Sequence, residues 1–438
     1  MTEMKSWVSS ANGDTDFPIQ NLPYGVFDDG RGARMGVAIG EMILDLGAVD
    51  HGLDPALLAE PAWNRVMEAG PQVWAQLRAR LTDLLSDESH RAAVEPHLVA
   101  QSKSRMLMPF RVAEYTDFYA GKHHATNIGT MFRGAENALP ANWLSVPIGY
   151  NGRASSVVVS GTPVPRPWGQ VKGPDEDLPR FSPSQRFDIE LEFGAIVGQP
   201  SQGMVSVAQA DEMIFGYVLL NDWSARDIQA WEYVPLGPFQ SKATATTISP
   251  WIVTRAALEP FRVATPERER PLLPYLREPG PMNYQIDLEV ALRPEGGAES
   301  VISRSDTAYL YYSAAQQLAH HTTSGCAMRV GDMLGSGTIS GADKDSRGSL
   351  LELSWGGKEP LELPDGQTRS FVEDGDTLTL RGAAKGDGYR IDHAGEGRSG
   401  HLPRPYRHAG RPRHCLRPRH AASLARERLT LPRRLAPR

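Results

Sequence analysis

Residues 187–193 constrain the fold more than any other segment, because apolar and acidic residues alternate there without a break. Side chains two residues apart lie on the same face of a β-strand, so Asp188, Glu190 and Glu192 are expected to share one face. Glu190 and Glu192 would then lie roughly 7 Å apart along the backbone. The pattern fits an amphipathic strand with its carboxylates in water. It also fits a strand whose like charges are relieved by a hard cation, so this segment alone leaves both interpretations open.

The rest of the chain predicts mainly β-structure with some α-helix, an α+β protein. With 42 glycines and 34 prolines among 438 residues, turns are favoured over a helical bundle. Apolar segments bounded by turn residues predict strands at residues 22–27, 33–40, 41–46, 216–220, 287–292 and 350–355, the last of which includes Glu352. Helical spacing of apolar residues predicts helices within residues 55–98 and 308–321.

Charge and cysteine content exclude several classes of protein. A formal net charge of −6 gives no reason to expect a nucleic-acid partner. Cys326 and Cys415 form neither a disulfide framework nor a zinc-ligand spacing, which fits a reducing compartment. The N-terminus lacks the apolar core of a secretory signal, and no apolar segment approaches the length that spans a bilayer. We therefore expect a soluble cytoplasmic protein with no membrane partner.

Titratable side chains are unusually dense in residues 115–133, which contain an acid, two tyrosines, two adjacent histidines and an arginine. Asp117 could hold a metal ion, a histidine could abstract a proton, and Arg133 could bind an anionic substrate. The segment alone does not decide between these roles and coincidence, because a metal site needs further carboxylates. Adjacent His320 and His321, by contrast, fit the favourable C-terminus of a helix better than a pair of ligands.

A second polar group is expected where the strand at 216–220 ends. Asp222 precedes a helix predicted over residues 225–233, for which Ser224 is a suitable N-cap. Arg226, Gln229 and Tyr233 would project from one face of that helix. The arrangement fits a functional site at the end of a strand, and it also fits a capped surface helix with an Asp–Arg ion pair.

Taken together, these motifs resemble the fumarylacetoacetase (fumarylacetoacetate hydrolase) family, over residues from about 15 to 391. The segments similar to that family are Tyr-Thr-Asp-Phe-Tyr with His-Ala-Thr-Asn, Gly-Tyr-Asn-Gly-Arg-Ala-Ser-Ser-Val-Val-Val-Ser-Gly-Thr-Pro, Asp-Ile-Glu-Leu-Glu, Asn-Asp-Trp-Ser-Ala-Arg-Asp-Ile-Gln, Trp-Glu-Tyr-Val-Pro-Leu-Gly-Pro-Phe and Gly-Ser-Gly-Thr-Ile-Ser-Gly. The resemblance implies an N-terminal SH3-like barrel with a helical linker over residues 1–110. It implies a catalytic domain of layered β-structure over residues 111–391, and a homodimer.

The resemblance also implies a reaction and a set of site residues. The reaction is hydrolysis of a carbon–carbon bond, in which fumarylacetoacetate and water give fumarate and acetoacetate, the last step of tyrosine and phenylalanine breakdown. The implied ligands of Mg²⁺ and/or Ca²⁺ are Asp117, Glu190, Glu192 and Asp222, with Lys242 and Thr246 at a neighbouring position. His124 matches the general base and Glu352 its orienting partner. The implied substrate contacts are Tyr119, Arg133, Tyr150, Gln229, Tyr233 and Thr338, while Arg226, Gln229 and Lys242 would stabilise the developing enolate.

Two departures from the family pattern bear on these expectations. Ala245 replaces a glycine expected beside Thr246, and its methyl group could crowd the loop that carries Lys242. Residues 392–438 are rich in Arg, Pro and His where the family continues with a short apolar strand, so we expect this tail to be disordered and without a catalytic role. The alternatives are a related acylpyruvate hydrolase or diketo-acid decarboxylase, and a non-catalytic metal-binding or scaffold protein.

Overall fold

A computed structural model describes residues 4–386, 389–392 and 397–399, and its first sheet is antiparallel throughout. The strands lie in the order β4-β3-β2-β1-β5. Their bounds are β1 (Tyr24–Asp28), β2 (Arg34–Ile39), β3 (Met42–Asp45), β4 (Leu98–Ala100) and β5 (Arg105–Leu107). The three strands predicted within residues 22–46 are confirmed, and the SH3-like assignment stays a prediction.

Helices between β3 and β4 share an apolar cluster with this N-terminal sheet. The predicted spacing of Trp74, Leu77, Leu81 and Leu84 falls on α2 (Pro71–Ser86), where the three leucines are buried. Tyr24 of β1 stacks on Trp63 at 4.2 Å between ring centroids and bonds through its backbone to Ile252. The described residues fall within one compact unit, Met1–Pro405.

A sheet of eight strands positions the candidate site. Its order is β7-β6-β21-β12-β13-β15-β8, and β16 also pairs with β13. The bounds are β6 (Tyr115–Phe118), β7 (Gly149–Asn151), β8 (Val157–Val159), β12 (Leu191–Val197), β13 (Ile214–Asp222), β15 (Thr246–Ile248), β16 (Val253–Thr254) and β21 (Met333–Gly335). The strand predicted at residues 216–220 is confirmed and extends further at both ends.

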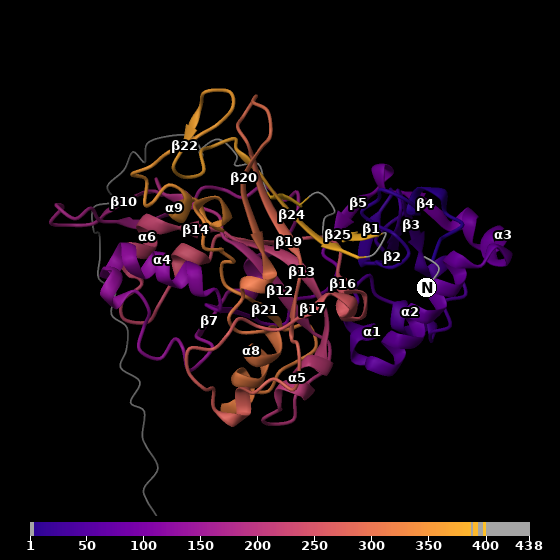
Figure 1. The fold of residues 1–438 in the computed structure, drawn as a ribbon. Helices are drawn as coiled ribbons and strands as arrows, with labels where there is room; N and C mark the ends of the chain where they lie inside the picture. Colours follow the sequence, from indigo (N-terminus) through magenta and orange to yellow (C-terminus); the bar gives the residue numbers. More distant parts are fainter. Residues whose placement is uncertain (1–3, 387–388, 393–396, 400–438) are drawn as a thin grey trace, which may run out of the picture. The chain divides into compact units, whose positions relative to one another are not determined.

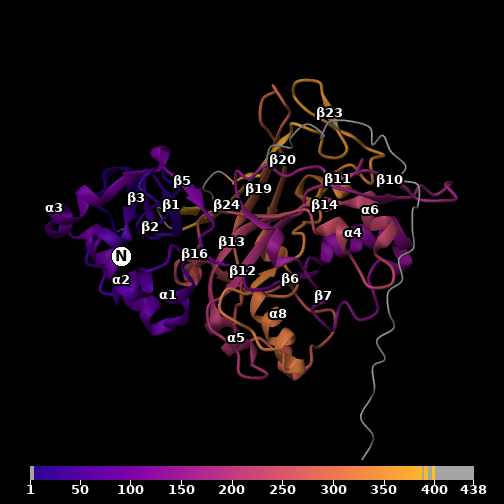
Figure 2. The same ribbon diagram turned by 180° about the vertical axis from the view of Figure 1, so that it is seen from behind.

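A third sheet packs against the second through a shared apolar cluster (Figures 1 and 2). It contains β19 (Asp287–Arg293), β20 (Ser300–Asp306), β24 (Thr377–Lys385), β25 (Arg390–Asp392) and β26 (Gly397–Ser399). Phe193 of β12 stacks on Tyr217 of the neighbouring strand β13 at 4.6 Å between ring centroids, and Tyr284, which belongs to neither sheet, meets Tyr217 edge-on. The strand predicted at residues 287–292 is confirmed. The predicted boundary at residue 391 falls inside β25. Of the tail predicted over residues 392–438, only residues 392 and 397–399 are described, and they lie in β25 and β26.

The helices are short, and together with the sheets they give a mixed α and β architecture. Their bounds are α1 (Asn64–Glu68), α2 as above, α3 (Arg91–Val94), α4 (Lys122–Arg133), α5 (Val207–Met213), α6 (Arg226–Glu232), α7 (Arg255–Leu258), α8 (Ala314–His321) and α9 (Leu350–Leu353). Over the described part of the chain, none of them combines the length and apolar character that crossing a membrane requires.

The single strand predicted over residues 187–193 is wrong in its middle. β11 (Phe187–Asp188) pairs with β14 (Ser224–Ala225), and the ladder of β12 resumes only at Leu191. Between them, the Ile189 N–H donates to the Asp188 carboxylate at 2.8 Å and the Glu190 N–H donates to the Asn221 side chain at 3.1 Å. These side-chain acceptors replace backbone partners, which interrupts the regular alternation.

Three further boundaries differ from the predictions. Residues 350–353 form the helix α9 rather than a strand, because the Ser349 hydroxyl accepts the Glu352 N–H as an N-cap. Ser224 is not the cap of α6, since it lies in β14 and its hydroxyl donates to Glu190. The helix predicted over residues 308–321 begins only at Ala314, after a separate turn of 3₁₀-helix. His320 and His321 do lie in its last turn, as predicted.

Candidate active site

Three buried carboxylates converge from three different strands of the eight-stranded sheet. Asp117 lies on β6, Glu192 on β12 and Asp222 at the end of β13. Each offers an oxygen within 4.8 Å of an oxygen of the other two. The order of strands explains the convergence, because β12 and β13 are neighbours and only β21 separates β12 from β6.

Glycines of the turn after β21 make room for this cluster. Gly335 pairs with Asp117 in the parallel ladder, and a Cβ there would lie 2.8 Å from the Asp117 Oδ1 and 2.9 Å from the Glu192 Oε2. Gly337 has a φ of +75°, a conformation that glycine adopts without strain. Its N–H donates to Glu192 at 3.1 Å. The Gly-Ser-Gly sequence therefore brings backbone close to the carboxylates without a side chain in between.

The cluster has the electrostatics of a cation site. Burial, followed by the charge of Asp117, raises the pKa of both Glu192 and Asp222 well above the usual range. The Oδ1 atoms of Asp117 and Asp222 are buried and have no hydrogen-bond partner. Buried like charges with unused lone pairs are costly unless a cation neutralises them. An all-oxygen donor set suits Mg²⁺ or Ca²⁺, so the residues fit such an ion.

Glu190, the fourth predicted ligand, lies beside this cluster but contacts cations of the protein itself. Its Oε1 accepts from the Arg226 Nη2 at 2.8 Å, and its Oε2 contacts the Lys242 ammonium. Lys242 also contacts Asp222, so it joins Glu190 to the three-carboxylate cluster. Burial lowers the pKa of Lys242 to about 8. Thr246 lies on β15 opposite Asp222 in the ladder, and Ala245 before it is buried in the apolar cluster.

His124 and Glu352 form a buried pair next to Glu190. The His124 Nδ1 lies 2.6 Å from the Glu352 Oε2, and its Nε2 lies 3.5 Å from the Glu190 Oε1. Hydroxyl groups of Ser340 and Ser349 donate to the same Glu352 oxygen, at 3.0 Å and 2.8 Å. Burial acts to raise the pKa of Glu352, but the charge and hydrogen bond of His124 together with these donors lower it to about 2. Glu352 is therefore held as a carboxylate.

A cavity of about 490 Å³ opens between α4, α6 and the sheet. This volume lies within the usual range for a small-molecule site. The predicted site residues that line it are Asp117, Tyr119, His124, Arg133, Tyr150, Glu190, Glu192, Arg226, Gln229, Tyr233, Lys242 and Thr338. The predicted residues that lie behind its wall are Asp222, Thr246 and Glu352. Sequence motifs spread over more than 200 positions are thus brought to one cavity.

The residues predicted to contact substrate differ in how they are held. The Tyr119 ring meets His124 edge-on at 5.6 Å, and the Tyr150 hydroxyl donates to Asp222 at 3.3 Å. Arg133, the last residue of α4, donates to the backbone carbonyls of Asn137 and Ala138 in the turn that follows, which orients its guanidinium at the cavity wall. Tyr233 is 43% exposed. The wall is therefore rigid near the carboxylates and more open at the α6 end.

Several residues of the site were not identified from the sequence. Asn127 donates to Glu352 at 2.9 Å, and Ser340 and Ser349 donate to the same carboxylate. Ser349 and Glu352 have the Ser-x-x-Glu spacing of a helix N-terminus, which could have corrected the strand predicted there. Asp188 was noticed only as part of the acidic alternation. It is fully buried and binds Arg226.

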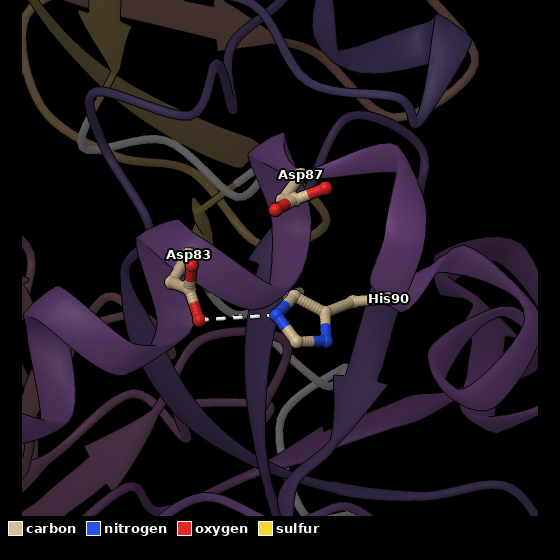
Figure 3. Close-up of side chains that lie close together, drawn as sticks. All are labelled: Asp83, Asp87 and His90. Carbon is tan, nitrogen blue, oxygen red and sulfur yellow. Dashed lines mark ion pairs between the residues drawn. The ribbon is translucent and has the colours of Figure 1, made fainter.

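A second group of possible ligands, Asp83, Asp87 and His90, lies on the helical part of the N-terminal segment (Figure 3). Both aspartates are exposed and have other partners. Asp83 forms ion pairs with Arg80 and His90, while Asp87 caps the turn that contains His90. Helix capping and surface ion pairs account for this group.

Two family models and the relatives most similar in sequence agree on one family. A family model described as "Fumarylacetoacetase N-terminal" matches residues 20–109, and one described as "Fumarylacetoacetate (FAA) hydrolase C-terminal" matches residues 114–433. The chain is 48% identical to a fumarylacetoacetase of Bos taurus over 86% of this chain and 94% of that protein. It is 47% identical to a fumarylacetoacetase of Arabidopsis thaliana over 89% of this chain and 97% of that protein. A solved fumarylacetoacetate hydrolase from Exiguobacterium antarcticum is similar over 87% of this chain and 99% of that chain, with 16% identity and a TM-score of 0.49.

Proposed function

Because this chain belongs to the fumarylacetoacetase family, whose members are hydrolases that act on carbon–carbon bonds, we propose that it hydrolyses fumarylacetoacetate and that His124 is the general base. The observation that best supports this proposal is that one cavity is lined both by His124, whose buried partner is Glu352, and by Asp117 and Glu192 of the three-carboxylate cluster. A base and a cation site facing one small cavity are what a water-dependent cleavage of a diketone requires.

The His124–Glu352 geometry assigns the proton to defined atoms. Glu352 remains a carboxylate and accepts the Nδ1–H of His124, which leaves Nε2 free to take a proton. The same carboxylate stabilises the imidazolium formed when Nε2 takes that proton. His124 is thereby fixed as one tautomer and one orientation, with its ring against the edge of Tyr119.

The proposed reaction is balanced by one water molecule. His124 takes a proton from water as the water oxygen bonds to the carbonyl carbon next to the fumaroyl double bond. The bond between that carbon and the central methylene group then breaks, and its electron pair leaves with acetoacetate as an enolate. Transfer of the proton from His124 to the enolate carbon gives acetoacetate and restores the base, and the hydroxyl group remains on fumarate.

Cationic residues on the cavity wall match the charge that develops in this step. Arg226 and Lys242 lie on the same wall as the carboxylate cluster, and Gln229 accepts from Arg226 at 3.3 Å. Positive groups held in place before the reaction stabilise an enolate without reorganisation, and one such donor is typically worth about 3 kcal/mol. Arg133, Tyr119 and Tyr233 would hold the terminal carboxylates of the substrate.

Asp117, Glu192 and Asp222, with Glu190 beside them, would hold a divalent cation of the Mg²⁺ or Ca²⁺ type. When bound, that ion supplies Lewis-acid polarisation of the diketone oxygens. Lys242 and Thr246 lie next to Asp222 and would support the same position. Both oxygens of Glu190 already accept hydrogen bonds, from Arg226 and Ser224, so Glu190 would keep these partners beside a bound ion.

Family membership supports further proposals about the whole protein. We propose that it acts as a homodimer in the cytoplasm, at the last step of tyrosine and phenylalanine breakdown. We also propose the division into an N-terminal SH3-like part over residues 1–110 and a catalytic part over residues 111–391. Size-exclusion chromatography with light scattering tests the dimer, and a monomer at micromolar concentration would contradict it.

A spectrophotometric assay of fumarylacetoacetate loss tests the proposed activity. Purified protein with added Mg²⁺ is expected to consume the substrate and to release fumarate and acetoacetate in equal amounts. Faster turnover of an acylpyruvate would favour the related hydrolase, and release of carbon dioxide would favour a decarboxylase. Binding of the cation without turnover of any of these substrates would favour the non-catalytic alternative.

A further inference from the structure

Asp188 is a fully buried aspartate whose two oxygens accept four N–H groups. Its Oδ1 accepts from the backbone of Ile189 and Leu350, both at 2.8 Å. Its Oδ2 accepts from the Arg226 Nε at 2.8 Å and from the Leu351 N–H at 3.1 Å. One carboxylate therefore binds a guanidinium of the cavity wall and the first two residues of α9. Asp188 itself does not line the cavity.

These contacts close a ring around the site. From Asp188 the ring passes through Arg226 to Glu190, at 2.8 Å for each ion pair. It continues from Glu190 to the His124 Nε2 at 3.5 Å and from the Nδ1 to Glu352 at 2.6 Å. Glu352 is the third residue of α9, whose first two N–H groups return to Asp188. The group proposed to stabilise the enolate and the group proposed to activate water thus share one anchor.

We propose that Asp188 is a positioning residue that sets the distance between Arg226 and the His124–Glu352 pair. This inference rests on the proposed function, because it assigns Asp188 a role in that reaction. The four N–H donors all converge on one short side chain, so neither Arg226 nor α9 can shift without breaking a buried hydrogen bond. Residues that orient catalytic groups in this way typically affect activity by about 10- to 100-fold when replaced.

Substitution by asparagine tests the role with little change of shape. Asn has one carbonyl oxygen and one NH₂ group, so in either orientation two of the four N–H donors would face another donor. If the NH₂ group replaces Oδ2, Arg226 and Leu351 lose their acceptor. If it replaces Oδ1, Ile189 and Leu350 lose theirs, and α9 is loosened. Asp188→Asn is therefore expected to lower kcat by about 10- to 100-fold, with KM little changed.

Asp376→Asn provides a matched control. Asp376 is also fully buried, accepts from the Nε and Nη2 of Arg369 at 2.9 Å and 3.0 Å, and accepts the Glu373 N–H at 2.9 Å. It does not line the candidate cavity. Loss of a buried Asp–Arg pair is common to both variants, so they should be similarly destabilised in thermal unfolding. Only Asp188→Asn is expected to lower kcat at a temperature where both are folded.

A double-mutant cycle separates positioning from general destabilisation. If Asp188 acts through Arg226, the further loss caused by Asp188→Asn in an Arg226→Ala background should be much smaller than in the wild-type protein. Fully independent effects, or a kcat for Asp188→Asn equal to that of Asp376→Asn, would overturn the inference while the activity of the wild type stands. An inactive wild type would instead contradict the proposed function.

A second variant is needed if Asp188→Asn does not fold. Asp188→Glu keeps the charge and moves the carboxylate by one methylene group, so it can still accept from Arg226 but not from α9 at the same time. Lowered kcat with wild-type far-ultraviolet circular dichroism is expected. A folded Asp188→Glu protein with wild-type kcat would overturn the inference.

Discussion

The His124 Nδ1 lies 2.6 Å from the Glu352 Oε2, and both side chains are buried. They are 228 positions apart in the chain. Glu352 is a carboxylate with three other donors, from Asn127, Ser340 and Ser349. A base held by so many contacts keeps one orientation through the catalytic cycle, and the first two predictions follow from that rigidity.

Replacement of His124 by alanine is expected to lower kcat by about 100- to 10,000-fold, because general-base catalysis is lost. His123→Ala is the matched control, since the His123 ring contacts Tyr309 rather than the cavity. Rates of fumarylacetoacetate loss measure both. Near-normal turnover by His124→Ala, or equal losses in the two variants, would refute the assignment of the base.

Glu352→Gln is expected to lower kcat without loss of the fold, because the charge that stabilises the imidazolium is removed while the shape is kept. Its effect should be much smaller in a His124→Ala background, since the two residues act as a unit. Measurement of kcat for both single variants and the double variant completes the cycle. Multiplicative losses would show that Glu352 does not act through His124.

Removal of divalent cations is expected to abolish turnover. Dialysis against EDTA should give inactive protein, and addition of Mg²⁺ or Ca²⁺ should restore the rate, because three buried carboxylates meet there and a bound ion would neutralise them. Isothermal titration of the dialysed protein with either ion measures binding directly. Asp117→Asn should weaken that binding, and full activity in excess EDTA would exclude a metal requirement.

Gly335→Ala is expected to weaken cation binding by about tenfold or more, because an added Cβ would lie 2.8 Å from Asp117 and 2.9 Å from Glu192. Gly47→Ala is a suitable control, since the nearest atom to its added Cβ is 3.8 Å away. Titration of both variants with Mg²⁺ measures the difference. Unchanged affinity in Gly335→Ala would show that the carboxylates do not bind the ion in this arrangement.

Asp306, which lies outside the candidate active site, is expected to make the stability of the protein depend on pH. Burial raises the pKa of Asp306 from 3.8 to about 6 in the folded protein. Between these two pKa values, the folded state binds more protons than the unfolded state. The contribution of Asp306 to the free energy of unfolding therefore falls as pH rises, and it is lost above about 6. Asp306→Asn should remove this slope. Urea unfolding across that range measures it.

An exposed aspartate, Asp177, provides the comparison for this measurement. Asp177→Asn is expected to leave the pH dependence of unfolding as it is in the wild type. If Asp306→Asn also leaves it unchanged, the raised pKa of Asp306 is refuted. If both variants flatten the curve equally, the slope reflects overall charge and not the burial of Asp306.

The local sequence pattern was sufficient to predict the helices and strands whose hydrogen bonds join backbone groups. The strand at residues 287–292 and the apolar spacing of α2 followed from periodicity, because regular burial of one face gives a regular sequence. The strand at residues 216–220 followed from a continuous apolar run, which is buried on both faces. Periodicity failed at residues 187–193. There the ladder is broken by Asn221 and by the Asp188 carboxylate, and no local signal shows that a side chain will replace a backbone partner.

The sequence by itself determined the chemistry available to this protein: acids at 117, 190, 192 and 222, a histidine at 124 and a family resemblance that predicted their roles. Only the tertiary structure decided which of these acids meet in one cluster and which contacts other side chains. Asp117, Glu192 and Asp222 meet because their strands are close in the sheet, whereas Glu190 is turned toward Arg226 and Lys242. Residues far apart in the chain create these contacts, and electrostatic balance in a buried site depends on distances that a linear pattern does not contain.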